Sequence, residues 1–334
     1  MKGKKVITYA VSFLVVVILL SAAVWRYIGH EKNEKKIEIT EAEADQTRVA
    51  FSMAEGDNPW TVKLVNELND AAREKNMELI YHEPETVTAE WQKKDIEALL
   101  EMDIEYLAVF PRDEKILPEI LTKAEKKKVP VILITKNLCY RNRCAALISI
   151  DYELEGQLAA RVLAENSKGE DCNIVEIKGP EESTVAQARS RGFRRELVKY
   201  PNLKVIAERN GDFDRLTAEN VMEEVISSYG KENIQAVFAS SDEEGLGILS
   251  ALKITGCHPG KDVDIVSING IQDTLKAIVA GEYTAAILSG NKMGFVLFEI
   301  IARRERGFDK GDFVVIPYQI YNSSNAEKYL LSLS

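Results

Sequence analysis

Short apolar runs alternate with amphipathic stretches along most of this 334-residue chain, and this alternation limits the available folds more than any other feature. Runs such as Tyr106–Phe110 and Ala236–Ala239 are short and apolar, which is typical of buried strands. The stretches between the runs, such as Trp60–Lys75, carry apolar residues at helical spacing. Because strands and helices alternate in regular order, the sequence predicts parallel sheets covered by helices on both faces.

The alternation occurs in two series, one before and one after about residue 150. Strands are expected at residues 48–53, 77–82, 106–110 and 129–135 in the first series, and at 172–177, 204–207, 236–239 and 264–268 in the second. Two series of this length exceed one domain of ordinary size, so the sequence predicts two doubly wound α/β lobes. Ligands of such sheets bind beyond the carboxyl ends of the strands, and we expect the binding site between the lobes.

The N-terminal segment differs from the rest of the chain. Val6–Trp25 carries no charged residue, and a helix of this length would span the ~30 Å hydrocarbon core of a bilayer. Lysines precede it, so the positive-inside rule places the N-terminus in the cytoplasm and the remainder outside. We expect residues 1–30 to be a membrane anchor and 31–47 a charged tether. A cleaved signal peptide is the alternative, because Ser21–Ala23 loosely fits a cleavage site.

The charge balance excludes one class of partner. The chain has 43 Lys and Arg residues against 53 Asp and Glu residues, a net charge of −10. A protein whose main task is to neutralise phosphates needs a basic surface. We therefore expect no nucleic-acid partner.

The four cysteines permit a disulfide and do not suggest a metal site. Cys139 and Cys144 flank a short polar loop and could pair in an oxidising compartment, a question that the sequence leaves open. Cys172 and Cys257 are expected to be small buried apolar residues. The chain has only three histidines and no second cysteine pair at zinc-ligand spacing, so we expect no metal.

The chain contains no recognisable catalytic or phosphate-binding motif. The patterns GxxxxGK[ST], GxGxxG and GxSxG are all absent from the sequence. Acidic groups such as Asp242-Glu243-Glu244 are common at helix starts, where they interact favourably with the helix dipole. We therefore expect neither enzymatic activity nor a cofactor.

Two loops place an aromatic side chain beside polar groups directly after a predicted strand. Asp57, Asn58 and Trp60 open the first helix of the body, although Asn58 followed by proline is also a good helix cap. Phe213 lies between two aspartates in the segment GDFDR. Its ring could contact a ligand or could instead pack in the core under the loop.

Several segments, in their joint order, resemble one known family. They include RVAFSMAEGDNPW, ISIDYELEGQLAA, TVAQARSRGF and AVFASSDE. The chain resembles type I periplasmic sugar-binding proteins, the substrate receptors of ATP-binding-cassette (ABC) importers, over about residues 48–331, and most of all the ribose- and galactofuranose-binding members. The resemblance implies an N-terminal lobe of residues 48–150 plus 289–315 and a C-terminal lobe of 151–288 plus 316–334. Three crossovers would join the lobes, which close on a ligand by a hinge.

The resemblance also implies a set of ligand contacts. They are Asp57, Asn58, Trp60, Thr61, Thr135, Lys136, Arg189, Phe213, Ser241 and Asn269.

Several of these positions depart from the family pattern. Thr61 stands where galactofuranose binders have Arg, Thr135-Lys136 replaces Asp-Arg, Ser241 replaces Asn, and Asn269 replaces Asp. Charged acceptors make the stronger hydrogen bonds to sugar hydroxyls. Their loss favours an anionic, amino- or acyl-modified sugar, or another small polar molecule, over an unmodified hexose.

These observations predict an extracytoplasmic solute-binding protein that delivers a small carbohydrate-like ligand to a membrane permease. The alternative is a membrane-tethered sensor that reports the ligand to a receptor such as a histidine kinase, because the anchor lacks a lipid-site cysteine. Transcription regulators of the lactose-repressor type share the core, but they need an N-terminal DNA-binding domain where this chain has its apolar segment.

Overall fold

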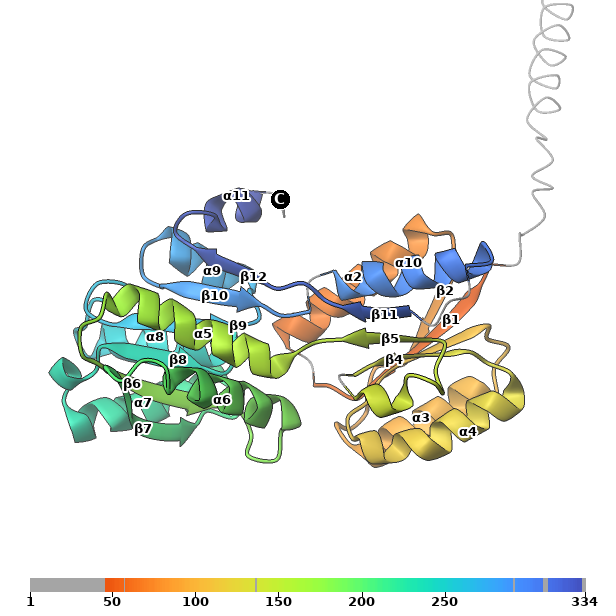
Figure 1. Cartoon of the computed structure of the whole chain (residues 1–334), viewed down its shortest axis with the longest axis horizontal. Coiled ribbons are helices and arrows are strands. Elements are labelled where there is room, and N and C mark those ends of the chain that lie inside the picture. The colour runs from red at the N-terminus through yellow and green to blue at the C-terminus, as the bar shows by residue number, and fades with distance from the viewer. Residues whose placement is uncertain (1–45, 57, 136, 291, 309–311, 332–334) are drawn as a thin grey trace, which may run out of the picture. The chain divides into compact units, whose positions relative to one another are not determined.

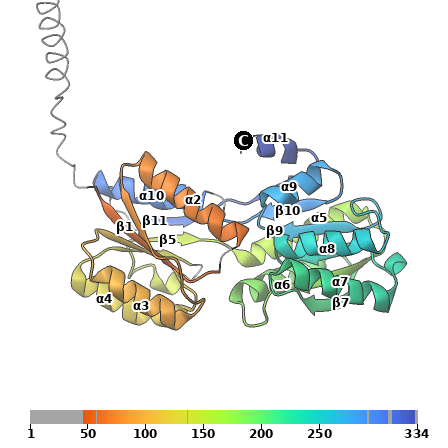
Figure 2. The same cartoon turned by 180° about the vertical axis from the view of Figure 1, so that it is seen from behind.

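The computed structural model describes residues 46–56, 58–135, 137–290, 292–308 and 312–331. Within these ranges the strands form two six-stranded sheets, each covered by helices on both faces (Figures 1 and 2). We call each sheet with its helices a lobe. The predicted two-lobed α/β fold is confirmed. The predicted anchor over Val6–Trp25 lies outside the described residues.

The first lobe contains a fully parallel sheet with strand order β11-β5-β4-β3-β1-β2. Its strands are β1 (Arg48–Met53), β2 (Glu78–Tyr81), β3 (Tyr106–Phe110), β4 (Val131–Ile134), β5 (Ala146–Ser149) and β11 (Asp312–Val315). Its helices are α2 (Pro59–Glu74), α3 (Ala89–Leu100), α4 (Leu117–Lys127) and α10 (Met293–Glu305). Helices α2 and α10 pack on one face, and α3 and α4 pack on the other.

The second lobe has strand order β12-β10-β9-β8-β6-β7. Its strands are β6 (Cys172–Lys178), β7 (Leu203–Asn210), β8 (Ala236–Ala239), β9 (Asp264–Ile268), β10 (Ala285–Leu288) and β12 (Gln319–Asn322). Its helices are α5 (Tyr152–Ser167), α6 (Thr184–Leu197), α7 (Arg215–Tyr229), α8 (Asp242–Ile254), α9 (Gln272–Val279) and α11 (Ala326–Leu331). Helices α5 and α6 cover one face and the other four cover the opposite face.

The expectation of purely parallel sheets is wrong for the edge strand β12, which runs antiparallel to β10. Gln319 at the start of β12 lies opposite Leu288 at the end of β10. Only residues 316–318 separate β12 from the carboxyl end of β11 in the other sheet. The chain therefore enters the second sheet at the edge where the parallel strands end, and β12 runs back along β10.

The chain passes between the two sheets three times, after β5, after β10 and after β11. Each passage leaves from the carboxyl end of a strand of a parallel array. The segments that connect the two sheets therefore begin at the carboxyl ends of strands. The positions of residues that directly follow these strands depend on the sheets as well as on the loops.

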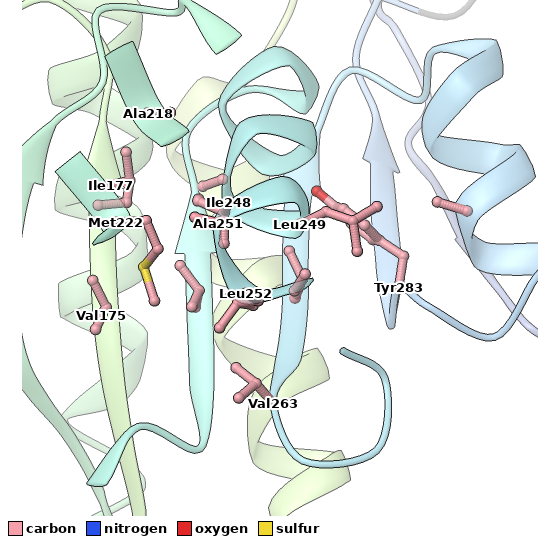
Figure 3. Packing of buried hydrophobic residues seen from close by; sticks show 14 of the residues in the cluster. Val175, Ile177, Ala218, Met222, Ile248, Leu249, Ala251, Leu252, Val263 and Tyr283 are labelled. Carbon is pink, nitrogen blue, oxygen red and sulfur yellow. The ribbon is translucent and has the colours of Figure 1, made fainter. Parts of the chain in front are cut away.

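The core of the second lobe shows why the alternating pattern folds this way. Figure 3 shows Val175 and Ile177 of β6 facing Met222 of α7 and Ile248 of α8. Alternate residues of the strand point to this face, whereas the helices contribute residues spaced by three or four positions. The strand residues at every second position and the helix residues at every third or fourth position thus pack against each other in one apolar layer.

The four cysteines are unpaired in the structure. Cys139 is exposed, and the Sγ of half-buried Cys144 lies 3.8 Å from the carbonyl oxygen of Arg141. The disulfide that the sequence allowed is therefore not formed here. Cys172 and Cys257 are buried as predicted, among apolar side chains of the second lobe.

In the described ranges, no helix combines the length and the apolar character that crossing a bilayer requires.

Replacing Phe238 by alanine should destabilise the second lobe strongly. The ring is fully buried and stacks on Phe193, with ring centroids 4.2 Å apart. Truncating such a side chain leaves a cavity and costs about 3–5 kcal/mol. Urea unfolding followed by circular dichroism would measure this loss. Val198→Ala is the matched control because Val198 is 83% exposed, and it should change the free energy of unfolding by less than about 0.5 kcal/mol.

Candidate functional site

Arg189 lies at the carboxyl ends of three neighbouring strands of the second lobe. Its Nη1 donates to the carbonyl oxygen of Ser240 at 2.8 Å, just after β8. Its Nη2 donates to Asn269 Oδ1 at 3.3 Å, after β9, and to Ser289 Oγ at 3.4 Å, after β10. Arg189 as a whole residue is only 4% exposed. The sheet therefore brings two predicted contacts, Arg189 and Asn269, into direct contact.

A buried glutamate neutralises this arginine. Glu155 Oε2 accepts from Arg189 Nε at 2.8 Å, and the Glu155 side chain is fully buried. The pair forms because α5 and α6 touch through their backbones. A Cβ on Gly156 would lie 1.9 Å from the carbonyl oxygen of Arg189, and one on Gly192 would lie 1.9 Å from that of Glu153. Both helices thus need glycine where they meet.

Tyr152 connects this arginine to the first lobe. The Arg189 Cζ lies 5.6 Å from the centroid of the Tyr152 ring, a cation–π distance. The same ring packs against the apolar cluster of the first lobe that also borders Trp60 and Phe110. Burial raises the pKa of the Tyr152 hydroxyl well above its ordinary value, so the ring stays uncharged.

Asn269 is held in place by a buried aspartate. Asp242 Oδ2 accepts from the backbone N–H of Ile271 at 2.6 Å, and its Oδ1 accepts from the hydroxyl of Ser267. The segment between these two partners contains Asn269 at φ +137° and Gly270 at φ +69°, both outside the ordinary range of L residues. Burial raises the pKa of Asp242, and these hydrogen bonds oppose the shift.

Phe213 occupies a strained loop after β7. Its φ is +58° and that of Asp212 is +56°, so two successive non-glycine residues are left-handed. Its backbone N–H donates to Glu244 Oε1 at 3.1 Å. The ring lies against Gly179, where a Cβ would come within 2.2 Å of ring carbon Cε1. The loop therefore depends on a partner from α8 and on the absence of a side chain at the end of β6.

Ser241 caps α8 and contacts the same glutamate. Its Oγ accepts from the backbone N–H of Glu244 at 3.3 Å and lies 3.0 Å from Glu244 Oε2. Burial raises the pKa of Glu244 to about 8, although its hydrogen bonds and the charge of Arg189 act in the opposite direction. This shift favours the protonated form of Glu244 at neutral pH.

Asn58, Trp60 and Thr61 lie at the start of α2 in the first lobe. Asn58 Oδ1 accepts from the backbone N–H of Thr61 at 3.0 Å, which is helix-capping chemistry. Thr61 is buried, and its Oγ1 has no hydrogen-bond partner among the described residues. The Trp60 ring lies 5.9 Å from that of Phe110. A Cβ on Gly290 would lie 3.7 Å from Trp60 Nε1, so the indole approaches the segment that follows β10.

Thr135 forms its hydrogen bonds with residues of the first lobe. Its Oγ1 donates to Glu114 Oε1 and accepts from the backbone N–H of Asn137 at 3.1 Å. Asn137 Nδ2 in turn donates to Glu114 Oε2 at 2.7 Å. Thr135 therefore belongs to a network within the first lobe. The predicted contacts Asp57 and Lys136 lie outside the described residues.

A second arginine–glutamate pair follows β1 and β3. Arg112 Nη1 lies 3.2 and 3.3 Å from the two carboxylate oxygens of Glu55, and its backbone N–H donates to Gln92 Oε1 at 2.8 Å. Burial raises the pKa of Glu55, and the charge of Arg112 opposes the shift. Both lobes thus present an arginine at their strand ends whose charge a carboxylate balances.

Glu155 and Glu244 are absent from the predicted contacts, although the sequence carries a signal for each of them. Glu155 is followed by Ala159 and Leu163 at intervals of four residues, and Glu244 is followed by Ile248 and Leu252. Each glutamate thus continues the apolar stripe of its helix, where a charged residue needs a partner or a proton. Asp242 and Tyr152 carry no comparable signal, and the sequence predicts Asp242 only as a helix-start residue.

The strand ends of the two lobes carry guanidinium, amide, hydroxyl and aromatic groups. Such a set can donate hydrogen bonds to polar oxygens and stack on apolar faces. In the part of the chain that the structure describes, no group of three or more His, Cys, Asp or Glu side chains could hold a metal ion.

Comparison with known proteins identifies relatives over most of the chain. The sequence model of a family described as a periplasmic binding protein domain matches residues 49–306. The galactofuranose-binding protein YtfQ of Escherichia coli is 28% identical over 250 residues, 74% of this chain and 78% of that protein. The ribose import binding protein RbsB of Bacillus subtilis is 25% identical over 286 residues, 86% of this chain and 87% of that protein.

A solved structure of a similar binding protein has the same fold as this chain. The crystal structure of a galactofuranose binding protein superposes with a TM-score of 0.76 at 25% identity, covering 85% of this chain and 97% of the other.

The protonated Glu244 should make stability fall as pH rises. Its folded pKa of about 8 exceeds the ordinary value of 4.5, so the folded state binds the extra proton between these two pH values. The contribution is fully present below pH 4.5 and declines by up to about 1.4 kcal/mol per pH unit until pH 8.

Urea unfolding at pH 5.5 and 7.5 would measure this decline. Glu244→Gln should remove it, so that the variant gains stability relative to the wild type at the higher pH. Glu243→Gln is the control, because Glu243 pairs with Arg215 near the surface, and it should retain the wild-type slope. Equal slopes for the wild type and Glu244→Gln would contradict the assignment.

Proposed function

The chain belongs to the periplasmic binding protein family as a type I sugar-binding member, and from this premise we propose that it is an extracytoplasmic receptor for a small, uncharged, carbohydrate-like ligand. We propose that it delivers this ligand to an ABC importer. Its relatives are binding proteins rather than enzymes, and their names describe galactofuranose binding and ribose import.

The position of Arg189 is the observation that carries this proposal. In open α/β sheets, ligands bind beyond the carboxyl ends of the strands, and Arg189 spans the ends of β8, β9 and β10. A guanidinium has five N–H donors in a fixed plane, and Nη1 contacts one protein acceptor, the carbonyl oxygen of Ser240. A donor therefore remains for a ligand oxygen.

The charge balance supports an uncharged ligand. Glu155 already neutralises Arg189, and Glu55 faces Arg112 in the same way. A charged ligand that loses its hydration shell needs an unpaired opposite charge, whereas a hydroxyl or an amide needs only hydrogen bonds. We therefore favour an uncharged ligand over the anionic sugar, which is one of the alternatives that the sequence leaves open. A neutral sugar, a polyol or an acyl-modified sugar fits better.

Two aromatic rings complete the proposed site. Phe213 extends from the second lobe, and Trp60 lies at the start of the first helix of the first lobe. Binding pockets for small molecules combine apolar and aromatic walls with a few polar groups. The C–H faces of a sugar ring would stack on these rings while its hydroxyls reach Arg189, Asn269 and Ser289.

Titration calorimetry of the full-length protein would test the proposal. We expect binding of at least one neutral member of a panel containing D-ribose, L-arabinose, D-galactose, D-allose, xylitol and myo-inositol. Arg189→Ala should weaken that binding by about tenfold to a hundredfold, the value of one hydrogen bond to a charged group. Arg195→Ala, which removes an exposed arginine from the same helix, should leave affinity unchanged. Absence of binding to every panel member, or equal affinity of the Arg189→Ala variant, would refute the proposal.

Glu155→Gln should change the preference between neutral and acidic ligands. Without the carboxylate, Arg189 keeps an unbalanced charge that attracts an anion. For D-galacturonate against D-galactose, we expect the ratio of affinities to rise at least about tenfold, or 1.4 kcal/mol. Glu153→Gln is the control on the same helix, because Glu153 pairs with Arg191 and Arg195 at the surface. A wild-type protein that already prefers the acid would contradict the charge argument.

A further inference from the structure

Glu244 lies between two of the proposed ligand contacts and touches both. Its Oε1 accepts from the backbone N–H of Phe213 at 3.1 Å, and its Oε2 lies 3.0 Å from Ser241 Oγ. The side chain is fully buried. Gly211 leaves room for it, since a Cβ there would lie 3.0 Å from Oε1. One carboxyl group thus joins the loop after β7 to the first turn of α8.

We propose that Glu244 is a positioning residue of the ligand site, whose carboxyl group holds Phe213 and Ser241 in the arrangement that meets the ligand. This inference rests on the proposed function and deepens it, because it makes the arrangement of the ligand site depend on the protonation of Glu244.

The contact with Phe213 positions the aromatic wall. Left-handed φ values at Asp212 and Phe213 are unfavourable for L residues, so the loop needs an interaction that selects this conformation. The bond from the Phe213 N–H to Glu244 is such an interaction, and its acceptor Glu244 is fully buried. Without it, the ring would no longer be held against Gly179.

The contact with Ser241 decides which hydrogen-bonding group faces the ligand. In the structure Ser241 Oγ donates to Glu244 Oε2. A proton on Glu244 Oε2 would reverse this bond, and the serine hydroxyl proton would then be left for a ligand oxygen. An ionised Glu244 can only accept, so it would take the serine proton for itself. The protonation state of Glu244 therefore sets whether Ser241 acts as a donor toward the ligand.

The surroundings of Glu244 favour the protonated form at neutral pH. The charged and titratable groups that act on it from neighbouring elements are Arg189 on α6 and Tyr283 after α9, and from its own helix Asp242 lies two residues away. Arg189 lowers the pKa of Glu244, but its charge is shared with Glu155. Desolvation is the larger effect and raises the pKa to about 8.

The pH profile of binding tests this inference. Calorimetry on the full-length protein would use the panel sugar of highest affinity between pH 6.5 and 9.5. For the wild type, we expect a constant Kd up to about pH 7.5 and a rise of at least tenfold by pH 9.5. Glu244→Gln keeps an acceptor for Phe213 and a donor for Ser241, so it should bind within threefold of the wild type at pH 7 and show no rise. Glu243→Gln should follow the wild-type profile.

A second variant removes both hydrogen bonds. Glu244→Leu should weaken binding at least tenfold at pH 7, and Glu244→Gln should not. In the ligand-free protein, hydrogen exchange of the Phe213 amide should be at least tenfold faster in Glu244→Leu than in Glu244→Gln.

The outcomes separate this inference from the proposed function. A wild-type Kd that does not change up to pH 9.5, or a Glu244→Gln variant that keeps the rise, overturns the role of Glu244 and leaves sugar binding intact. If no panel sugar binds at any pH, the proposed function fails. Hydrogen exchange then still tests whether Glu244 positions Phe213. Equal exchange rates of the Phe213 amide in Glu244→Leu and Glu244→Gln overturn the positioning role of Glu244.

Discussion

The buried ion pair between Arg189 and Glu155 is the interaction on which the candidate site depends. Removing one partner of a buried pair costs about 3–5 kcal/mol, because the other charge is left without compensation. The pair requires α5 and α6 to meet backbone to backbone, which Gly156 and Gly192 allow. From that position the arginine reaches three strand ends at once. Helix packing and ligand geometry in the second lobe are therefore parts of one arrangement.

Three buried acids of the second lobe meet the cost of desolvation in different ways. Glu155 is paired with a cation, Asp242 is surrounded by hydrogen-bond donors, and Glu244 keeps its proton. Each holds a different part of the site: Arg189, the segment of Asn269, or the loop of Phe213. In this lobe, buried carboxyl groups thus hold in place the residues that are predicted to contact the ligand.

Family resemblance and sheet geometry agree on two of the predicted ligand contacts. Arg189 and Asn269 were both expected at the site, and the structure places them in contact. Thr135 was expected there as well, but Glu114 and Asn137 take its hydrogen bonds. The sequence could not reveal this competition, because Glu114 lies 21 residues before Thr135 and follows a different strand. The glutamates at 155 and 244 were visible as charges on apolar stripes, but their partners were not.

By itself, the sequence determined the alternation of strands and helices, the division into two lobes and the apolar faces of the helices. These features follow from local periodicity. A strand buries every second residue and a helix every third or fourth, so the spacing of apolar residues along a short segment indicates which element it forms. The tertiary structure alone decided the direction of β12, the free state of Cys139 and Cys144, and the partners of each buried charge. Arg189 meets Asn269 and Ser289 across separations of 80 and 100 residues, through the strand order β10-β9-β8. Such neighbours are set by which strands pair, and strand pairing is a property of the whole fold.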